Sequence, residues 1–308
     1  MFEIREKPDW LKPLFPWRQH SLKVNGRHMA YIDEGDPRAR PVLLLHGNPT
    51  WGFLYRFFVD PLTQAGYRVI VPDFIGAGYS EHPRTDSRLT LAHHIADLVS
   101  LIDQLRLRGF VTVGQDWGGP QSIGAALQRL ERLDAMVLMN TWAYATYKGK
   151  PLTPPAWWLT PQQPMVGQYF MKRQKLWSHD GPSLTTIRGL SAAEARGYHH
   201  VFDETDSEHV VLCWPRTLPK RENDRGWRDF VHIQSRLPEL AGTPILLLWA
   251  PEDSTFPIQF AHRLKELLPH AEGPLLFDRA AHFLQDDRGP DLADAIVEFL
   301  NRKAGAVL

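Results

Sequence analysis

The stretch Gly114-Gln115-Asp116-Trp117-Gly118-Gly119 constrains the fold of this chain more than any other part of the sequence. It follows an apolar run over 110–113 and precedes a segment with helical character that begins near Pro120. Glycines on both sides of one functional residue are typical of a nucleophile elbow, where a buried strand turns sharply into a helix and lifts one side chain into a cleft. We therefore expect a strand to end at Asp116 and a helix to begin directly after it.

Strand-like and helical segments alternate on both sides of this elbow. Continuous apolar runs, which suit strands buried on both faces of a parallel sheet, lie at 42–45, 68–71, 111–113, 135–139, 244–249 and 275–277. Helical spacing of apolar residues is found over 53–65, 91–105, 121–130, 258–268 and 290–303. Near the N-terminus, Asn25-Gly26 predicts a hairpin turn between two β-segments at 21–24 and 28–33. The pattern predicts an α/β fold with a mostly parallel sheet flanked by helices.

The alternation stops between about 143 and 230. This stretch is rich in proline, contains adjacent tryptophans and has no regular order of strands and helices. We interpret 143–230 as an inserted, helical cap subdomain, and we assign 1–142 and 231–308 to the α/β core domain. A chain of 308 residues is long enough for one large domain that carries such an insertion.

Composition argues against several classes of partner. Lys+Arg and Asp+Glu are equal at 35 each, so no excess charge favours nucleic acid or an acidic membrane. No stretch reaches the ~18 apolar residues of a membrane span, and the first dozen residues lack the apolar core of a signal peptide. The single cysteine, Cys213, suits a reducing compartment. We therefore expect a cytoplasmic protein, and association into a homo-oligomer through exposed apolar surface stays open.

Side chains capable of chemistry stand where the predicted strands end, which is the edge at which open parallel sheets bind ligands. They are Asn48, then Asp116 with Trp117, then Asp253, and finally His282. The order of nucleophile, acid and histidine along the chain is that of α/β-hydrolases.

The carboxylate at the elbow determines the chemistry. Asp116 stands where serine is usual, and a carboxylate can displace a leaving group from saturated carbon to form an ester with the enzyme. His282, with an ordinary pKa of ~6.5, suits the activation of the water that cleaves this ester, and Asp253 would orient its imidazole. Backbone N–H groups of Asn48 and Trp117 would form the oxyanion hole. This chemistry favours alkyl halides or epoxides over esters.

Neighbouring residues offer weaker alternatives. Glu252 competes with the adjacent aspartate for the role of the acid, and we interpret His46 as a loop-packing residue. The pairs His93-His94 and His199-His200 lack the i, i+4 spacing of helical metal ligands. The glycines that follow the run at 68–71 lack the third glycine of a dinucleotide-binding fingerprint. We therefore expect no metal and no cofactor.

Several segments resemble haloalkane dehalogenases of the α/β-hydrolase superfamily. The resemblance lies in HGNPTW at 46–51, PDFIGAGYS at 72–80, QDWGG at 115–119, WPRTLP at 214–219 and AHFLQDD at 281–287. It covers most of the chain and is weakest in the predicted cap before Trp214. Taken together, these segments, with a tryptophan directly after the nucleophile, are specific.

The resemblance implies a hydrolase that converts a small apolar haloalkane and water to an alcohol, a halide ion and a proton, through an alkyl ester on Asp116. It also implies that the indole N–H of Trp117 and the side-chain amide of Asn48 bind the halide. Asn140 stands where some members carry the orienting acid as a glutamate, so Asp253 takes that role. Gln115 replaces a histidine common in the family, and we expect its side chain to face away from the site.

Three alternatives stay open at this point. An epoxide hydrolase would use the same Asp-His-Asp set together with acidic tyrosines, and the predicted cap offers Tyr144, Tyr147, Tyr169 and Tyr198. A cofactor-free, luciferase-type oxygenase also occurs on a dehalogenase-like scaffold. The third alternative is a non-catalytic binding protein on the same fold.

Overall fold

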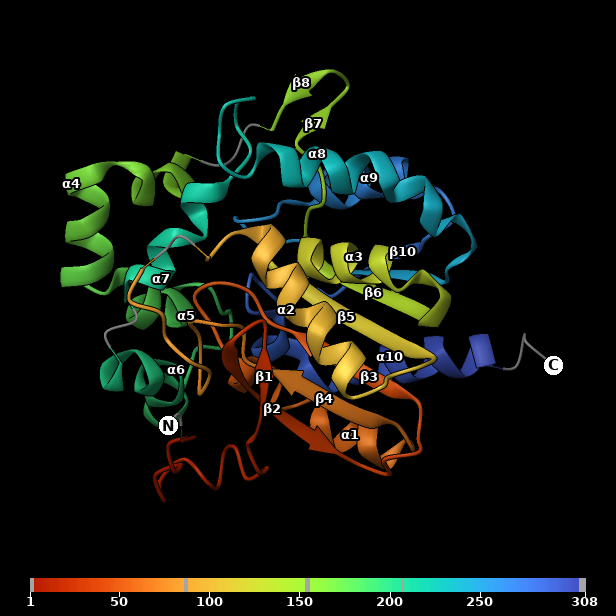
Figure 1. Ribbon diagram of the computed structural model, residues 1–308, viewed down its shortest axis with the longest axis horizontal. Helices are drawn as coiled ribbons and strands as arrows, with labels where there is room; N and C mark the ends of the chain where they lie inside the picture. The colour runs from red at the N-terminus through yellow and green to blue at the C-terminus, as the bar shows by residue number, and fades with distance from the viewer. Residues whose placement is uncertain (1–2, 86–87, 153–155, 206–207, 305–308) are drawn as a thin grey trace.

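The apolar runs of the sequence form the centre of one eight-stranded sheet, in the order β1-β2-β4-β3-β5-β6-β9-β10 (Figure 1). The structure, a computed structural model, describes residues 3–85, 88–152, 156–205 and 208–304. The strands are β1 His20–Val24, β2 Arg27–Glu34, β3 Pro41–Leu45, β4 Arg68–Pro72, β5 Phe110–Asp116, β6 Leu133–Thr141, β9 Ile245–Trp249 and β10 Glu272–Leu276. Strand β2 pairs antiparallel with both β1 and β4, and every other pair in this sheet is parallel. The expected mostly parallel sheet is confirmed.

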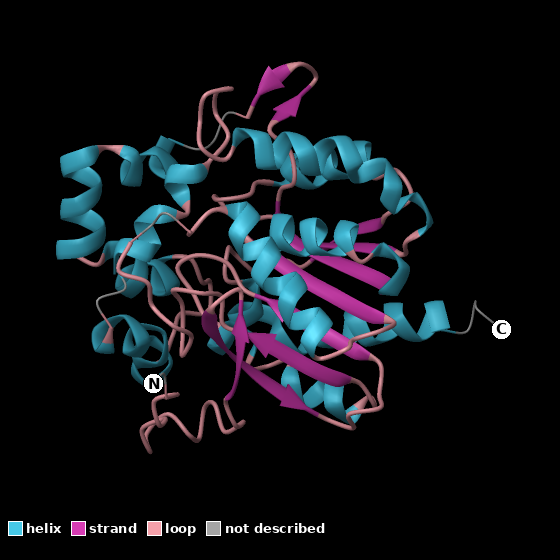
Figure 2. Cartoon of the chain, viewed as in Figure 1, coloured by secondary structure: helices cyan, strands magenta, loops and turns pink. Residues whose placement is uncertain are grey.

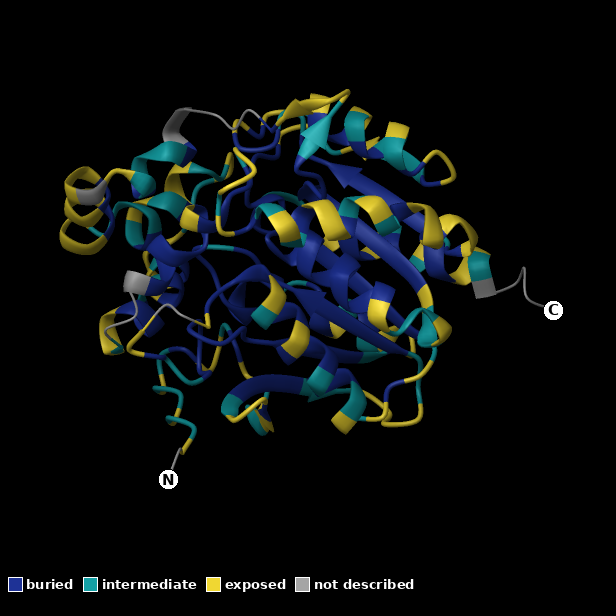
Figure 3. Cartoon of the chain, turned by 45° about the horizontal axis from the view of Figure 1, so that its top comes forward, coloured by how far each residue is buried: buried dark blue, intermediate teal, exposed yellow. Residues whose placement is uncertain are grey.

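Helices cover both faces of this sheet (Figure 2). One face packs against α2 Leu91–Gln104, α3 Gly118–Gln128, α8 Trp227–Arg236 and α9 Ile258–Leu267, and the other against α1 Val59–Gln64 and α10 Leu284–Ala304. Alternate residues of β3 enter the two cores: Leu43 and Leu45 the first, Val42 and Leu44 the second. Because successive side chains of a strand point to opposite faces, burial on both faces explains the continuous apolar runs. Strands β3, β5 and β9 are accordingly buried along their whole length (Figure 3), whereas β1 and β10, at the two edges of the sheet, are mostly intermediate or exposed.

Two helices differ from the sequence prediction. The segment 53–65 forms two short helices, η1 Gly52–Tyr55 and α1, instead of one. The last helix begins at Leu284, six residues before the start that we predicted at Pro290. Pro290 suits the start of the part of this helix that follows the kink, because proline is favoured in a first helical turn. A helical turn precedes it, joined through a kink at Arg288, whose φ of −136° is not helical.

Between β6 and β9 the chain leaves the sheet, and α4–α7 gather at one end of it (Figure 1). The described elements there are a hairpin, β7 Thr146–Tyr147 with β8 Lys150–Pro151, and then η3 Ala156–Gln162, α4 Pro164–Gly167, η4 Gln168–Arg173, η5 Leu176–Asp180, α5 Gly181–Leu184, α6 Ala192–Glu204, α7 Glu208–Cys213 and η6 Pro215–Thr217. We call residues 143–226 the insert. The predicted boundary at 230 falls inside α8, which packs against α3. Two further 3₁₀ turns, η2 Leu130–Arg132 and η7 Leu237–Gly242, precede β6 and β9. Among the described helices, none has the length and apolar character to span a bilayer.

The elbow after β5 has the sharp turn that the glycines predicted. Asp116 ends the strand with φ +53°, in the left-handed region, and α3 begins at Gly118. A Cβ placed on Gly118 would lie 2.0 Å from the carbonyl oxygen of Leu45 on β3. The start of α3 therefore passes so close to the neighbouring strand that position 118 has no room for a side chain.

We expect Gly118→Ala to destabilise the fold by about 1–3 kcal/mol, because the added methyl group must push α3 away from β3. Urea unfolding followed by circular dichroism measures the change. Gly242→Ala is the matched control, since a Cβ there would meet nothing within 4 Å. If both variants unfold at the same urea concentration, the close approach is not a constraint on position 118.

Candidate active site

Asp116 lies at the carboxyl end of β5, and its carboxylate accepts hydrogen bonds from two backbone N–H groups. The N–H of Asn48 donates to its Oδ1 at 2.8 Å, and the N–H of Trp117 hydrogen-bonds the same carboxylate. Thr141 Oγ1 donates to the carbonyl oxygen of Asp116 at 2.5 Å, which supports the left-handed turn from β6. Burial raises the pKa of Asp116 to about 6, although the nearby His282 and the two N–H groups oppose that rise. The carboxylate is therefore ionised above about pH 6.

His282 stands between the two aspartates that the sequence analysis selected. Its Nδ1 lies 3.0 Å from Asp253 Oδ2, and its Nε2 lies 3.9 Å from Asp116 Oδ2. A ring that donates from Nδ1 to Asp253 keeps Nε2 as a proton acceptor on the Asp116 side. Burial acts to lower the pKa of His282, but the charge and hydrogen bond of Asp253 prevail and raise it above its ordinary value. The ring is thus held in place by Asp253 and made more basic by it, and the charge of Asp116 adds to this rise in pKa.

Asp253 itself is fixed by two donors. The N–H of Thr255 donates to Oδ1 at 2.6 Å, and Asn140 Nδ2 donates to Oδ2 at 2.7 Å. The competing residue, Glu252, lies at the surface, where its Oε1 accepts from the N–H of Arg279 at 3.1 Å. The structure therefore places Asp253, and not its neighbour, against the histidine.

The role of Asn140 was missed by the sequence analysis, which treated this residue only as a lost acid. Its Oδ1 accepts from the N–H of Ala250 at 2.8 Å, so that the amide oxygen binds the backbone of β9's loop while the amide nitrogen reaches Asp253. The signal that could have found it is positional. Asn140 stands near the end of β6, the strand adjacent to β9, so it faces the loop that carries the acid.

The expectation for Gln115 is wrong. Its Nε2 donates to the carbonyl oxygen of His282 at 3.0 Å and lies 3.3 Å from the ring nitrogen Nδ1. Gln115 shares its strand face with Val111 and Val113, which belong to the same core as Phe283. The loop that carries His282 packs over this face of β5, and the Gln115 side chain therefore meets it.

Asn48 and Trp117, the two predicted halide donors, line a cavity of about 340 Å³ together with Asp116 and His282. The rest of its wall is mostly apolar and comes largely from the insert, with Trp142 directly before it. The insert residues are Trp158, Leu176, Trp177, Gly181, Leu184, Thr185, Pro215 and Leu218. One N–H of the Asn48 side-chain amide donates to the carbonyl oxygen of Val211 on α7, at 3.2 Å. The amide has two such N–H groups, so the second is not used by this bond.

His46 packs the loop that presents Asn48. Its Nε2 accepts from the N–H of Phe74 at 3.0 Å, and its Nδ1 lies 2.8 Å from the carbonyl oxygen of Gly47. Burial lowers the pKa of His46 to about 4, so the ring is neutral near pH 7. This supports the interpretation of His46 as a loop-packing residue.

The fold is shared with known proteins. The family profile described as alpha/beta hydrolase fold matches residues 40–289 of this sequence. The chain belongs to the alpha/beta hydrolase fold family. The expected α/β-hydrolase architecture is thereby confirmed.

Curated relatives cover nearly the whole chain. A cis-3-alkyl-4-alkyloxetan-2-one decarboxylase of Xanthomonas campestris pv. campestris is 31% identical over 90% of this chain and 93% of its own. Haloalkane dehalogenase 2 of Mycobacterium bovis is 30% identical over 92% of this chain and 96% of its own. The tetrameric haloalkane dehalogenase DpaA of Paraglaciecola agarilytica NO2 is 25% identical, with a TM-score of 0.78, and covers 92% of this chain and 93% of its own. The resemblance to haloalkane dehalogenases is confirmed, as is the expectation that the chain is an enzyme.

We expect Asp253→Asn to lower the pKa of His282, because the burial that opposes its charge remains while the carboxylate that contributes most to raising the pKa is gone. A proton NMR titration of the histidine ring, assigned with a His282→Gln variant, measures this shift. Glu252→Gln removes the adjacent surface carboxylate and should leave the titration unchanged. A larger shift in Glu252→Gln than in Asp253→Asn would reverse the assignment of the partner.

Proposed function

We propose that this enzyme hydrolyses haloalkanes to an alcohol, a halide ion and a proton through an alkyl ester on Asp116. The observation that carries the proposal is the contact series Asp116, His282 and Asp253 at one end of a mainly apolar cavity. A carboxylate nucleophile suits displacement at saturated carbon. The confirmed resemblance to haloalkane dehalogenases supports the same reaction.

In the first step, Oδ2 of Asp116 attacks the carbon that bears the halogen, since Oδ1 is occupied by the N–H of Asn48. The carbon–halogen bond breaks, and the halide leaves with the bonding electrons. We assign the halide to the indole N–H of Trp117 and the free side-chain N–H of Asn48, both of which stand in the cavity wall. Hydrogen bonds to a charged group contribute roughly 1.5–3 kcal/mol each.

In the second step, water cleaves the ester. His282 Nε2 takes a proton from the water, whose oxygen bonds to the carboxyl carbon of Asp116. The negative charge that develops on Oδ1 meets the backbone N–H groups of Asn48 and Trp117, which serve as the oxyanion hole. Asp253 stabilises the imidazolium. The bond between the carboxyl carbon and Oδ2 then breaks, and the imidazolium of His282 gives its proton to the departing oxygen, so that the alcohol leaves with Oδ2. The new carboxyl group of Asp116, which now holds the oxygen of the water, loses its proton and the ionised Asp116 is restored.

We propose that residues 143–230 act as a cap over this reaction, since most of the apolar cavity wall comes from that stretch. The epoxide-hydrolase alternative has less support from the geometry. It needs a tyrosine O–H at the ring oxygen, and no tyrosine is among the described residues that line the cavity. Two of the tyrosines considered are engaged elsewhere, because Tyr198 donates to Asp286 and Tyr147 to Glu266.

A second candidate function is the decarboxylation of a four-membered lactone, which the 31% identity to an oxetanone decarboxylase favours. Asp116 would attack the saturated ring carbon that bears the ring oxygen, and the released carboxylate would bind the donors assigned to the halide. The bond between this carboxylate and its carbon then breaks, its electrons form a carbon–carbon double bond, and the ester bond to Asp116 breaks. The products are CO₂, an alkene and free Asp116. No water is consumed, so His282 has no proton to transfer.

We expect His282→Phe to accumulate a hexyl ester on Asp116 when it is mixed with 1-bromohexane. This variant keeps the nucleophile and its donors but loses the base that activates water, a change that typically slows such a step by about 10²–10⁴-fold. Intact-protein mass spectrometry and peptide mapping locate the added hexyl mass. Asp116→Ala is the control without a nucleophile. A folded His282→Phe variant that gains no mass contradicts the proposed mechanism.

The same variant separates the two candidate functions. Given a cis-3,4-dialkyl oxetan-2-one, a decarboxylase should form the alkene at a similar rate with and without His282, because that route needs no base. Gas chromatography of the alkene measures the rate. Wild-type enzyme that releases halide from bromoalkanes and forms no alkene from the lactone rules out the second candidate. Alkene without halide release would replace the first candidate with the second.

A further inference from the structure

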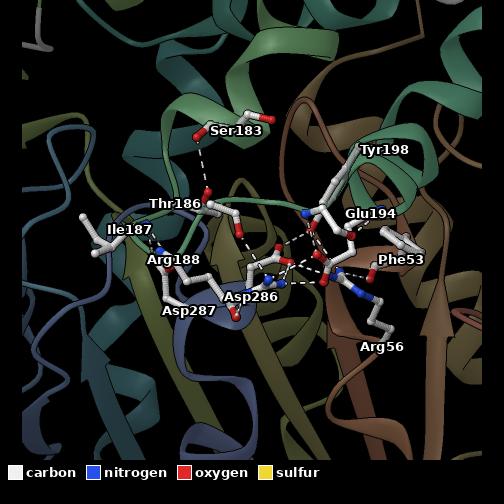
Figure 4. Close-up of polar contacts among 12 residues, drawn as sticks. Phe53, Arg56, Ser183, Thr186, Ile187, Arg188, Glu194, Tyr198, Asp286 and Asp287 are labelled. Atoms are coloured by element: carbon white, nitrogen blue, oxygen red, sulfur yellow. Dashed lines mark hydrogen bonds and ion pairs between the residues drawn. The ribbon is translucent and has the colours of Figure 1, made fainter.

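A cluster of charged and hydroxyl side chains joins the insert to the first turn of α10 and to Arg56 (Figure 4), and none of its members lines the cavity. We call it the buried cluster; its members are Arg56, Arg188, Glu194, Tyr198 and Asp286. The side chains of Arg56 and Asp286 are 2% and 0% exposed. The cluster has no place in the two steps above, although Asp286 lies only four residues after His282.

Arg56 and Asp286 form the centre of the buried cluster. Arg56 is ion-paired with Asp286, donates to Glu194 Oε1 at 3.0 Å, and donates to the carbonyl oxygen of Phe53 at 3.2 Å. The hydroxyl of Tyr198 on α6 donates to Asp286 Oδ2. A buried charge is tolerated only where it is paired and hydrogen-bonded, so these contacts hold the start of α10 against η1 and α6.

Arg188 connects the insert to the same carboxylates. It donates to Glu194 Oε1 at 2.6 Å, to Asp286 Oδ1 at 3.0 Å, and to the carbonyl oxygen of Asp286 at 2.6 Å. Although burial opposes its ionisation, hydrogen bonds from Arg188, Ser191 and Arg56 lower the pKa of Glu194 to about 2. The charges of the two arginines and the two carboxylates in the buried cluster therefore compensate one another, and these contacts hold Arg188 against Asp286.

Asp287, the next residue along the chain, bridges two segments with one carboxylate. Its Oδ1 accepts the N–H groups of Ile187 and Arg188, at 2.8 and 2.9 Å, and its Oδ2 accepts the N–H of Ala281 at 2.9 Å and shares the N–H of Ile187 at 3.0 Å. Ala281 precedes His282 directly. The carboxylate thus ties the insert to the residue before the histidine.

A second bridge lies on the other side of the histidine. The N–H of Phe283 donates to the carbonyl oxygen of Thr185 at 3.1 Å. Thr185 and Leu184 both line the cavity. Both chain neighbours of His282 are therefore tied to residues 185–188 of the insert. Phe283 is tied by a direct hydrogen bond, and Ala281 through the carboxylate of Asp287.

We propose that Asp287 is a positioning residue that holds His282 where it activates water, by tying the chain before the histidine to residues 187–188 of the insert. The buried cluster aligns this carboxylate, because it fixes Asp286 on one side and Arg188 on the other. The inference rests on the proposed hydrolysis through an ester on Asp116. Asp116 is held by β5 and the Asn48 loop, which Asp287 does not touch, so only the second step depends on this tie.

Single-turnover kinetics of Asp287→Ala with 1-bromohexane test the proposal. Ester formation should stay close to the wild-type rate, while ester hydrolysis slows by about 10- to 100-fold, as expected when a catalytic group is misplaced by about 1 Å. The ester should then accumulate and be visible by mass spectrometry. Asp287→Asn keeps one of the two acceptor oxygens and should therefore give a hydrolysis rate between those of the wild type and Asp287→Ala. If Asp287→Ala does not fold, Asp287→Asn takes its place in this experiment.

Asp291→Ala is the matched control, since Asp291 lies on the same helix, carries the same charge and pairs only with Arg288 at the surface among the described residues. Equal slowing of both steps, or no change in either, in Asp287 variants with native melting temperature overturns the proposal. His282→Phe run in parallel tells this failure apart from failure of the proposed function, because that variant must still form the ester. Hydrogen exchange adds a readout without substrate: peptides over 281–283 should exchange faster in Asp287→Ala than in Asp291→Ala, and equal exchange also counts against the tie.

Discussion

The site depends on the sharp turn that follows β5. Asp116 takes a left-handed φ of +53°, and the start of α3 lies against the Leu45 carbonyl of β3, where only glycine fits. Such a backbone costs of order 1–3 kcal/mol and persists only where its surroundings enforce it. Here two hydrogen bonds hold Asp116 in this conformation. Thr141 on β6 donates to its carbonyl oxygen, and the N–H of Asn48 donates to its carboxylate. The turn that strains the chain is also what directs the carboxylate at its backbone donors.

From that turn, the remaining parts are distributed over adjacent strands. The acid, Asp253, follows β9, and its amide donor Asn140 lies near the end of β6. Gln115, near the end of β5, donates to the carbonyl oxygen of His282. Neighbouring parallel strands deliver their carboxyl ends to one edge of the sheet, so residues more than a hundred positions apart meet within hydrogen-bond distance. The insert then contributes most of the apolar wall and, through residues 185–188, contacts on both sides of His282.

Much of this arrangement was predictable from the sequence, because strand ends and glycine turns leave local signals. The runs that precede Asn48, Asp116 and Asp253 are apolar on both faces, and their ends therefore locate the site. The contacts of Gln115 and Asn140 were not predictable in the same way. They depend on which loop packs across a given strand face, and that is decided by long-range packing of the two cores. The insert was the hardest part, since its short helices follow no single period.

Two buried ionisable groups near the elbow, Asp116 and His46, also affect how the stability of the fold depends on pH. Burial raises the pKa of Asp116 to about 6, so its contribution to stability is present at low pH and is lost as pH rises through that value. Burial lowers the pKa of His46 to about 4, so its contribution is present above its ordinary value of 6.5 and is lost as pH falls toward 4. Between about pH 4 and 6 the two slopes, ~1.4 kcal/mol per pH unit each, have opposite sign. At mildly acidic pH the carboxylate of Asp116 is therefore neutralised, while the opposite effects of Asp116 and His46 on the free energy of unfolding nearly cancel.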